Sequence, residues 1–439
     1  MLEAVVLGSF IAGLLLCLVL GRSVVYALVL GLLLFIGYGL IKGHRLSAVL
    51  KMCLKGIKTI SNILLVLLMI GALTGIWRAC GTIPYIIYHA AGLITPQAFI
   101  LAAFILSGFF SVLTGTAFGT AATMGVICTT MGTALGAAPL WTGGAVLAGC
   151  FFGDRCSPMS TSALLVAQLS GTSIFENIPM MIKTSLVPFA ATCAVFLAAG
   201  FSEGAHGAAG DVVSLFAEHF SLLWYCVLPA AVIIIMSLFR IDVKITVAVS
   251  TLLGGVLCFA VQRQDIGTIL QTALTGFKCE DAQLARMLSG GGITSMVSSV
   301  SIVCLTSCYS GIFEGTGLLD GAKSLVSRLA SRITPFGGVL SAAIFTALIS
   351  CNQALPIMLT HQLSSDAVPD NRKLAIYLEN SAVVIPPLIP WSIAGAVPLA
   401  TIGAPAAAVV CACYLYFIPL WNLALALFKR RREKKAAVS

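Results

Sequence analysis

Long apolar runs, rather than an alternating pattern, dominate this chain. Residues 4–20, 63–77 and 245–261 are examples, and similar runs recur from one end of the sequence to the other. A helix that crosses the hydrocarbon core of a membrane needs roughly 17–25 mostly apolar residues. A membrane-spanning barrel would instead show alternating segments of about 10 residues. The pattern therefore predicts an all-α polytopic membrane protein.

The first apolar run is predicted to be a retained helix and not a cleaved signal peptide. It has no basic segment and no small-residue cleavage site, and a second apolar run follows directly after Gly21 and Arg22. A secretory signal peptide carries both of the missing features. We therefore count residues 4–20 as the first membrane segment.

The composition excludes a soluble fold. Only 9% of the 439 residues are charged and 59% are hydrophobic, whereas a soluble domain carries roughly 25% charged residues. So few charges cannot cover the surface of a soluble body of this size. The net charge of +9 is explained by cytoplasmic loops and the basic C-terminal tail. Nothing else in the sequence indicates a nucleic-acid partner.

The sequence contains no pattern that predicts an enzyme. Its fifteen cysteines lie within apolar stretches without a CxxC pair, which is typical of small buried hydrophobic residues and not of metal or redox sites. It has no GxxxxGK[ST] motif for ATP, no catalytic Ser/His/Asp set and no zinc-type histidine cluster. We expect no resident cofactor, only transported ions.

The first half of the chain matches the second half in four stretches that occur in the same order. The pairs are 20–57 with 239–277, 75–81 with 311–317, 94–96 with 333–335, and 154–169 with 379–394. One short match could arise by chance, but four with conserved order and spacing indicate an internal repeat.

The charges of matching loops predict that the repeats are inverted. Residues 42–58 carry five Lys or Arg and no acid, while their counterpart, 263–286, carries three basic and three acidic residues. Because basic loops stay in the cytoplasm, matching loops should lie on opposite sides of the membrane. This requires an odd number of crossings in each repeat, and inverted repeats are typical of secondary transporters.

We therefore predict two inverted-topology repeats with broken or re-entrant helices and about 10–14 membrane segments in all. The predicted divisions are 1–200 for the first repeat, 201–219 for an extracytoplasmic linker, 220–428 for the second repeat, and 429–439 for a basic cytoplasmic tail. Both termini are then cytoplasmic, and the expected location is the bacterial inner membrane. The lipid bilayer is the expected environment, and a homodimer is a further expectation.

Four interrupted segments, two in each repeat, are the predicted binding site. Transporters of this type bind ions and substrates where helices are broken near the midplane, because freed carbonyls and helix ends become ligands. We expect the four segments to converge around one cavity. The candidate ion- or substrate-binding residues are Thr114, Thr116, Asp154, Ser157, Ser160, Thr161, Asn352, Gln353, Glu379, Asn380 and Ser381.

Asp154 and Glu379 are the predicted Na⁺ ligands and proton carriers. A hard cation prefers carboxylate, hydroxyl and carbonyl oxygens, and an ionisable residue within a membrane segment is a functional candidate. Sodium and a proton that compete for one carboxylate would produce antiport. The alternative for Asp154 is a structural ion pair with Arg155. Arg78 and Glu314 occupy equivalent positions, and both a gating role and a structural ion pair stay open.

Two motifs resemble those of a known family. Residues 152–158 (FGDRCSP) resemble the GD-x-x-SP motif of the NhaC-type sodium/proton antiporters, and LENS at 378–381 with PLIPW at 387–391 resembles that family's second signature. Thr114, Thr116 and the Asn352-Gln353 pair also correspond to family positions. The resemblance implies inverted repeats with broken helices, and exchange of cytoplasmic Na⁺ for external H⁺.

Two positions depart from the family pattern and keep other functions open. Many members carry Asp-Thr-Thr-Asn after the Ser-Pro pair, where this chain has Met159-Ser160-Thr161-Ser162, and Asn380 replaces an acid. Relatives in the family exchange organic acids such as malate and lactate. The alternative is therefore a sodium- or proton-coupled carrier of a small organic solute, such as an organic acid or amino acid. A channel or a non-transporting membrane protein is the third class.

Overall fold

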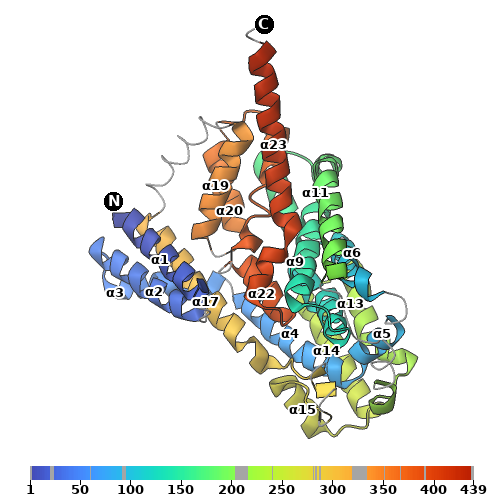
Figure 1. Ribbon diagram of the computed structural model, residues 1–439. Helices are drawn as coiled ribbons and strands as arrows, with labels where there is room; N and C mark the ends of the chain where they lie inside the picture. The colour runs from blue at the N-terminus through green and yellow to red at the C-terminus, as the bar shows by residue number, and fades with distance from the viewer. Residues whose placement is uncertain are drawn as a thin grey trace.

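The computed structural model describes most of the chain as helix (Figure 1). The described residues are 2–19, 24–59, 61–90, 95–202, 216–239, 241–279, 281, 284–285, 288–318, 334–350, 352–365, 367–389 and 392–436. In these ranges there is no β-strand, only an isolated bridge between Phe277 and Gly290. The all-α prediction is confirmed for this part of the chain.

The first half forms the helices α1 to α11, which include one 3-10 turn and one π-helical turn. Their bounds are α1 Leu2–Val19, α2 Val24–Ile41, α3 Leu46–Thr59, α4 Ser61–Ala79, α5 Thr82–Ala90, η1 Pro96–Ala98, α6 Phe99–Thr114, α7 Ala117–Thr120, η2 Ala121–Gly125, α8 Val126–Ala134, α9 Pro139–Cys156, α10 Thr161–Ser170 and α11 Ile174–Ser202.

The second half follows a similar order of long and short helices. Their bounds are η3 Trp224–Val227, α13 Leu228–Leu238, α14 Val243–Ala260, α15 Ile266–Thr275, η4 Ile293–Met296, α17 Val297–Thr316, α19 Pro335–Ile349, α20 Ala354–Ser364, α21 Asn371–Glu379, η5 Pro386–Leu388, α22 Ile393–Thr401, η6 Ala406–Cys411 and α23 Cys413–Ala436. The predicted linker lies mostly at 203–215, outside the described residues.

Among the described residues, one helix is both long and apolar enough to cross a membrane by itself. This is α11, with 29 residues. The pair Leu64–Ala79 and Thr82–His89 meets the same criteria only when taken together, and it is bent by 61°. The other apolar helices are shorter, for example Phe99–Thr114 and Lys244–Ala260. The number of crossings therefore stays a prediction.

Each predicted interruption in the first half ends a helix. At the end of α6, Gly115 adopts a left-handed conformation (φ 66°), and the side chain of Thr116 then caps α7 by accepting from the N–H of Gly119. At the end of α9, Ser157 is extended, and the side chain of Ser160 caps α10. Because a left-handed or extended residue cannot continue an α-helix, these local choices break the two segments.

The second half is interrupted in the corresponding places. Ser350 is extended after α19, and α20 starts at Ala354. Helix α21 ends at Glu379, and a turn containing the 3-10 helix η5 leads to Ser392, whose side chain caps α22. All four predicted interruptions are therefore helix ends.

Helices from the two halves pack against each other in matching pairs. Helix α3 packs on α17 and α15 packs on α4, while α2 packs on α17 and α14 packs on α4. Glycines permit the closest approaches. A Cβ on Gly311 would lie 2.0 Å from the carbonyl oxygen of Met52, and one on Gly75 would lie 2.7 Å from that of Thr272. No larger residue fits at either crossing without a shift of the backbone.

Two of the hydrophobic clusters in the described part of the chain are larger than the rest. The larger one is built mainly from α6, α8, α9 and α23, and a separate one joins α1, α2 and α3 to α17. In Figure 1 the latter group lies to one side of the helices that carry the interrupted segments. Neighbours of the candidate site belong to the larger cluster (Phe151) and to smaller ones (Cys156 and Leu378).

Candidate functional site

Asp154 is buried near the end of α9 and accepts hydrogen bonds from two serines. Its Oδ1 accepts from the hydroxyl of Ser160 at 3.0 Å, and its Oδ2 accepts from the hydroxyl of Ser162 at 2.8 Å. Its exposed fraction is 4%. The carboxylate is thus held by hydroxyls at the first turn of α10. Thr161 lies between these serines but its side chain is exposed.

Ser162 is a site residue that the sequence reasoning missed. The prediction named Ser157, Ser160 and Thr161 in this segment, but not the residue after them. On a helix, positions 160 and 162 do not usually share a face. Here Ser160 is the N-cap with extended backbone, so its side chain and that of Ser162 both reach Asp154. Only the position of the helix start could have indicated this.

Arg155 is the most extensively hydrogen-bonded side chain of the site. It is completely buried, and it joins the end of α9 to α11, α21 and α23. It donates to the carbonyl oxygens of Glu379 (3.1 Å) and Met181 (3.2 Å), to the hydroxyls of Thr184 (3.1 Å), Tyr414 (3.4 Å) and Ser185, and to Oδ1 of Asn380.

All of these oxygen acceptors are neutral. Asp154 accepts from serines instead, so the hydrogen bonds of the described residues favour a separate role for Asp154 over a structural pair with Arg155. The reason is geometric, because successive residues of a helix point about 100° apart. Arg155 therefore turns toward α11 and α21, while Asp154 turns toward α10.

Glu379 is the last residue of α21 and is completely buried. Neither of its carboxyl oxygens has a hydrogen-bond partner in the described part of the chain. It lies within electrostatic range of both Arg155 and Asp154. A buried carboxylate with no donor is unfavourable unless it binds a proton or another cation, or is balanced by a nearby positive charge.

Asn380 and Ser381 form hydrogen bonds within the protein beside Glu379, and their predicted role in binding stays a prediction. Oδ1 of Asn380 accepts from Arg155 and from the hydroxyl of Thr184, and the hydroxyl of Ser381 donates to the carbonyl of Tyr377 at 2.6 Å. The amide oxygen of Asn380 thus lies beside the Arg155 guanidinium.

The interrupted segment after α6 packs against the one after α9. A Cβ on Gly115 would lie 2.6 Å from the carbonyl carbon of Met159, and the hydroxyl of Ser157 donates to the carbonyl of Val112 at 2.7 Å. The hydroxyls of Thr114 and Thr120 are 3.3 Å apart. These contacts bring the two segments of the first half together.

The segment after α19 reaches the same region. The side-chain amide of Gln353 donates to the carbonyl of Val383 at 2.9 Å. The same side chain is also a neighbour of the Asp154 carboxyl group. Asn352 accepts from the N–H of Leu355 at 2.9 Å. The buried hydroxyl of Ser350 has no partner among the described residues. The four segments therefore converge, while a cavity between them stays a prediction.

Arg78 and Glu314 are less closely connected to this cluster. Arg78 lies near the end of α4, and a Cβ on Gly290 would lie 3.1 Å from its Nη1. Its Nε has no partner in the described part of the structure. Glu314 is on α17, but its side chain lies outside the described part. Their predicted pairing or gating role therefore stays a prediction.

Comparison with known proteins identifies the family. The model of the Na⁺/H⁺ antiporter family matches residues 1–168 and 149–428. The malate-2H⁺/Na⁺-lactate antiporter of Bacillus subtilis is 28% identical over 408 residues, covering 88% of this chain and 86% of that protein. The Na⁺/H⁺ antiporter NhaC of the same organism is 26% identical over 402 residues, covering 88% of each.

A more distant relative is the arginine/ornithine antiporter ArcD of Halobacterium salinarum. It is 25% identical over 353 residues, which cover 77% of this chain and 73% of that protein. The chain belongs to the Na⁺/H⁺ antiporter family, and the resemblance predicted from its motifs is confirmed.

Proposed function

Because the chain belongs to the Na⁺/H⁺ antiporter family, we propose that it is a secondary transporter that exchanges cytoplasmic Na⁺ for external H⁺ across the bacterial inner membrane. One observation carries the proposal. Two buried carboxyl groups, Asp154 and Glu379, lie within electrostatic range of each other and of a buried guanidinium, Arg155, where four helix ends converge.

The charge balance of this cluster explains how exchange would arise. Arg155 is permanently charged, so one ionised carboxylate balances it. A second ionised carboxylate leaves one buried negative charge, which is costly unless a cation neutralises it. Either a proton or a sodium ion can do so, but binding of one removes the charge that attracts the other. The two ions therefore alternate.

Asp154 is the better placed of the two acids for sodium. Sodium, a hard cation, is bound by oxygen ligands, and Asp154 already has the hydroxyls of Ser160 and Ser162 beside its carboxylate. Glu379 has no such neighbours in the described residues, so it is the better candidate for a carboxyl group that carries a proton. Ser157, Thr114, Thr116, Asn352, Gln353 and Ser381 then shape the segments around the ions.

A membrane-embedded pair of inverted repeats is part of the proposal. Large apolar side chains such as Phe201 and Leu252 are 70% and 71% exposed, which suits contact with lipid. The proposed divisions are residues 1–200 and 220–428, with a linker at 201–219 and a cytoplasmic tail at 429–439.

The glycine crossings support a two-fold relation between the repeats. In the sequence match Met52 corresponds to Thr272 and Gly75 to Gly311. A rotation that exchanges the halves would therefore convert the Met52–Gly311 contact into the Thr272–Gly75 contact, and both close approaches occur. The loop charges favour an axis in the membrane plane. In Figure 1 the C-terminal end of α23 and helix α15 lie at opposite ends of the molecule, which is compatible with a cytoplasmic tail and an extracytoplasmic segment 263–286.

A coupled carrier of an organic solute is the alternative, since relatives are named as malate–lactate and arginine–ornithine antiporters. An organic acid would need a cationic partner in the site. Arg155, however, already donates to acceptors on α11, α21 and α23, which leaves little hydrogen-bonding capacity for a substrate carboxylate. This favours the cation.

The test uses purified protein in liposomes with an imposed pH gradient. Addition of sodium should release protons in the wild type, while malate, lactate, arginine and ornithine should not. Exchange driven by an organic solute, with no response to sodium alone, would reject the proposal in favour of the alternative.

A further inference from the structure

Three cysteine thiols lie close together beside α15. Cys80 is in the turn after α4, Cys226 is in η3 and Cys258 is near the end of α14, and all three are completely buried. A Cβ on Gly81 would lie 3.6 Å from Sγ of Cys226, and one on Gly254 would lie 3.6 Å from Sγ of Cys80. None of these thiols belongs to the ion site described above.

Cys80 and Cys258 are in direct contact. Their thiols share a hydrogen bond, and both side chains belong to a hydrophobic cluster that joins α4, α14 and α15. The pair is far apart in the sequence, so no CxxC spacing indicates it. Because α4 belongs to the first half of the chain and α14 to the second, a bond between these sulfurs would join the two halves. Cys80 follows the last residue of α4, which leaves room for the small shift that disulfide geometry requires.

The sulfur of Cys80 has the polar neighbours that a reactive thiol needs. The hydroxyl of Thr82 lies 3.1 Å from Sγ of Cys80, where either atom can be the donor. Donation to the sulfur by this hydroxyl and by the thiol of Cys258 favours the thiolate, which is the form that attacks a disulfide. The pair also lies near the surface, since Gln262 is only partly buried and donates to the carbonyl of Cys80 at 3.3 Å.

The segments around this pair are those for which the loop charges predict an extracytoplasmic location. Gln262 also donates to the carbonyl of Ser221 at 3.3 Å, and Ser221 follows the predicted extracytoplasmic linker. Ile269 and Ala273 of α15 pack against the cluster that contains both cysteines, and they belong to the segment 263–286 with its three acidic residues. These neighbours favour the outer surface for the thiol pair.

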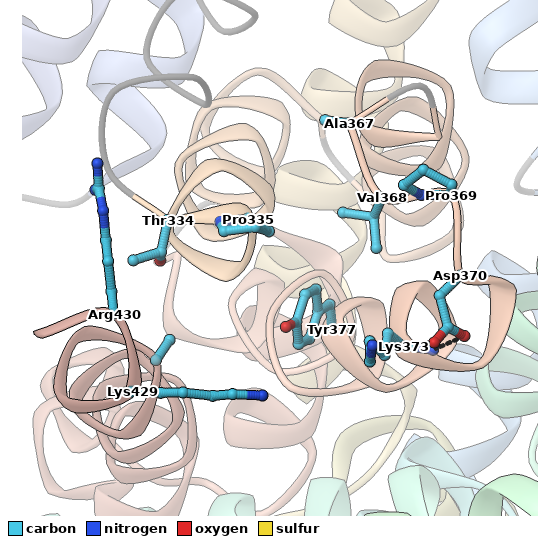
Figure 2. Close-up of a pocket in the computed structure, with 11 residues that line it drawn as sticks. Thr334, Pro335, Ala367, Val368, Pro369, Asp370, Lys373, Tyr377, Lys429 and Arg430 are labelled. Atoms are coloured by element: carbon cyan, nitrogen blue, oxygen red, sulfur yellow. Dashed lines mark hydrogen bonds and ion pairs between the residues drawn. The ribbon is translucent and has the colours of Figure 1, made fainter. Parts of the chain in front are cut away.

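Basic side chains gather at the other end of the molecule. Lys373, Lys429 and Arg430 line a cavity of about 500 Å³ between the starts of α19 and α21 and the C-terminal part of α23 (Figure 2). In Figure 1 this part of α23 and helix α15 lie at opposite ends. Because lysine and arginine are retained on the cytoplasmic side, we expect the thiols beside α15 to face the opposite compartment.

We propose that Cys80 and Cys258 form a disulfide bond that joins α4 to α14 at the extracytoplasmic surface. Disulfides form and persist in oxidising compartments such as the bacterial periplasm, and they are rare in the cytoplasm. The inference rests on the proposed membrane topology, and it adds a covalent link between the two halves of the proposed transporter.

The bond forms by exchange with an external disulfide, carried by a thiol oxidoreductase or by a small molecule. The thiolate of Cys80 attacks one sulfur of that disulfide and releases the other as a thiolate, which takes up a proton. The thiolate of Cys258 then attacks Sγ of Cys80 in the mixed disulfide and releases the second thiolate. The two protein thiols lose two electrons and two protons, and the external disulfide is reduced to two thiols.

A second pair of thiols in the same protein provides an internal control. Cys53 on α3 is hydrogen-bonded to Cys308 on α17, and both are buried beside the close crossing at Gly56 and Gly311. This pair also joins the two halves, but Cys53 lies within the basic segment 42–58, which is predicted to be cytoplasmic. Cys53 and Cys308 should therefore stay reduced, although they too are in contact.

The test is made on full-length protein in the cells that produce it. The cells are quenched with acid, the protein is unfolded, its thiols are alkylated, and peptides are analysed by mass spectrometry without reductant. We expect most molecules to yield a linked peptide pair containing Cys80 and Cys258, while Cys53 and Cys308 are alkylated. Reduction should also lower the unfolding temperature of the purified protein in detergent, because a disulfide restricts the unfolded chain.

Serine variants test which thiols form the bond. Cys258→Ser should remove the linked peptide and make the unfolding temperature insensitive to reductant. After addition of glutathione disulfide, this variant should retain a mixed disulfide at Cys80, because the second attacking thiol is missing. Cys226→Ser is the matched control, since it removes the neighbouring thiol and should leave both the linked peptide and the effect of reductant unchanged.

Three results would overturn the inference. The first is alkylation of both Cys80 and Cys258 in the wild type, and the second is a link from Cys80 to Cys226. The third is equal oxidation of the Cys53–Cys308 pair, because that would remove the difference between the two compartments. The measurement needs neither sodium nor a pH gradient, so its outcome is separate from that of the exchange assay in liposomes.

Discussion

The interrupted segments at the ends of α9 and α21 differ in the hydrogen-bond partners that they provide for their acidic residue. Asp154 lies near the end of one helix and Glu379 ends the other, and each is followed by a break and a short helix. Asp154 receives two serine hydroxyls, whereas both oxygens of Glu379 lack a partner in the described structure. Similar backbone breaks in the two halves thus surround their acids with different polar groups. This difference favours sodium binding at Asp154 and proton binding at Glu379.

The substitution Asp154→Asn should have the largest effect. It keeps the size and polarity of the side chain but fixes the neutral state, so the cation that the serines help to hold has no charge to bind. We expect the rate of sodium-dependent proton release to fall by at least about a hundredfold, because the free-energy cost of removing one partner from a buried charged pair is of that size. Proton flux is measured in vesicles after addition of sodium, across the neutral pH range.

The control for this variant is Asp370→Asn, which neutralises an acid outside the cluster and should exchange at the wild-type rate. If Asp154→Asn exchanges sodium for protons at the wild-type rate, Glu379 is the carboxylate that binds the exchanged ions.

Glu379→Gln should separate the two acids. If Glu379 carries the proton, the variant imitates its protonated state. It should bind sodium less tightly than the wild type but more tightly than Asp154→Asn, which loses the ligand itself, while proton coupling falls by an order of magnitude or more. Sodium binding is measured by calorimetry in detergent and proton flux in vesicles. Equal loss of sodium binding in Glu379→Gln and Asp154→Asn would mean that both carboxylates form one undivided site.

Arg155→Lys tests the link between the segments. Lysine retains the charge but not the planar set of donors, so several buried acceptors lose their partners, and we expect destabilisation by about 3 kcal/mol. Unfolding is followed thermally in detergent. Arg372→Lys is the control, because Arg372 pairs with Glu176 at 2.8 Å while both side chains are mostly exposed. A change within about 0.5 kcal/mol is expected there.

Gly75→Ala and Gly311→Ala test whether the halves are equivalent outside the acids. Each methyl group would meet a backbone carbonyl of the opposite half, and we expect each to destabilise the protein by about 1–3 kcal/mol. Gly37→Ala is the control, since a Cβ there has open space on α2 and alanine is the better helix former. A harmless change at only one crossing would contradict the proposed two-fold relation.

Ser162→Ala should have the smallest effect. Loss of one hydroxyl to the Asp154 carboxylate is worth about 1–2 kcal/mol, and we expect sodium affinity to fall by roughly tenfold. Thr161→Val changes an exposed hydroxyl between the two serines and should leave the affinity unaltered. If Thr161→Val weakens sodium binding more than Ser162→Ala does, the serine pair is not the sodium site.

The sequence by itself determined the helical class, the positions of the four breaks and the two acids. These depend on local properties, because apolar length selects helices, while glycine, proline and capping serines end them wherever they occur. The tertiary structure decided which partners the side chains have.

That Arg155 contacts Asn380 and Tyr414, that Ser162 and not Thr161 faces Asp154, and that Lys373 and Lys429 share a cavity follow from how helices distant in the chain approach one another. Side-chain direction around a helix turns by about 100° per residue, so a motif alone identifies the segment but not the neighbour that each residue meets.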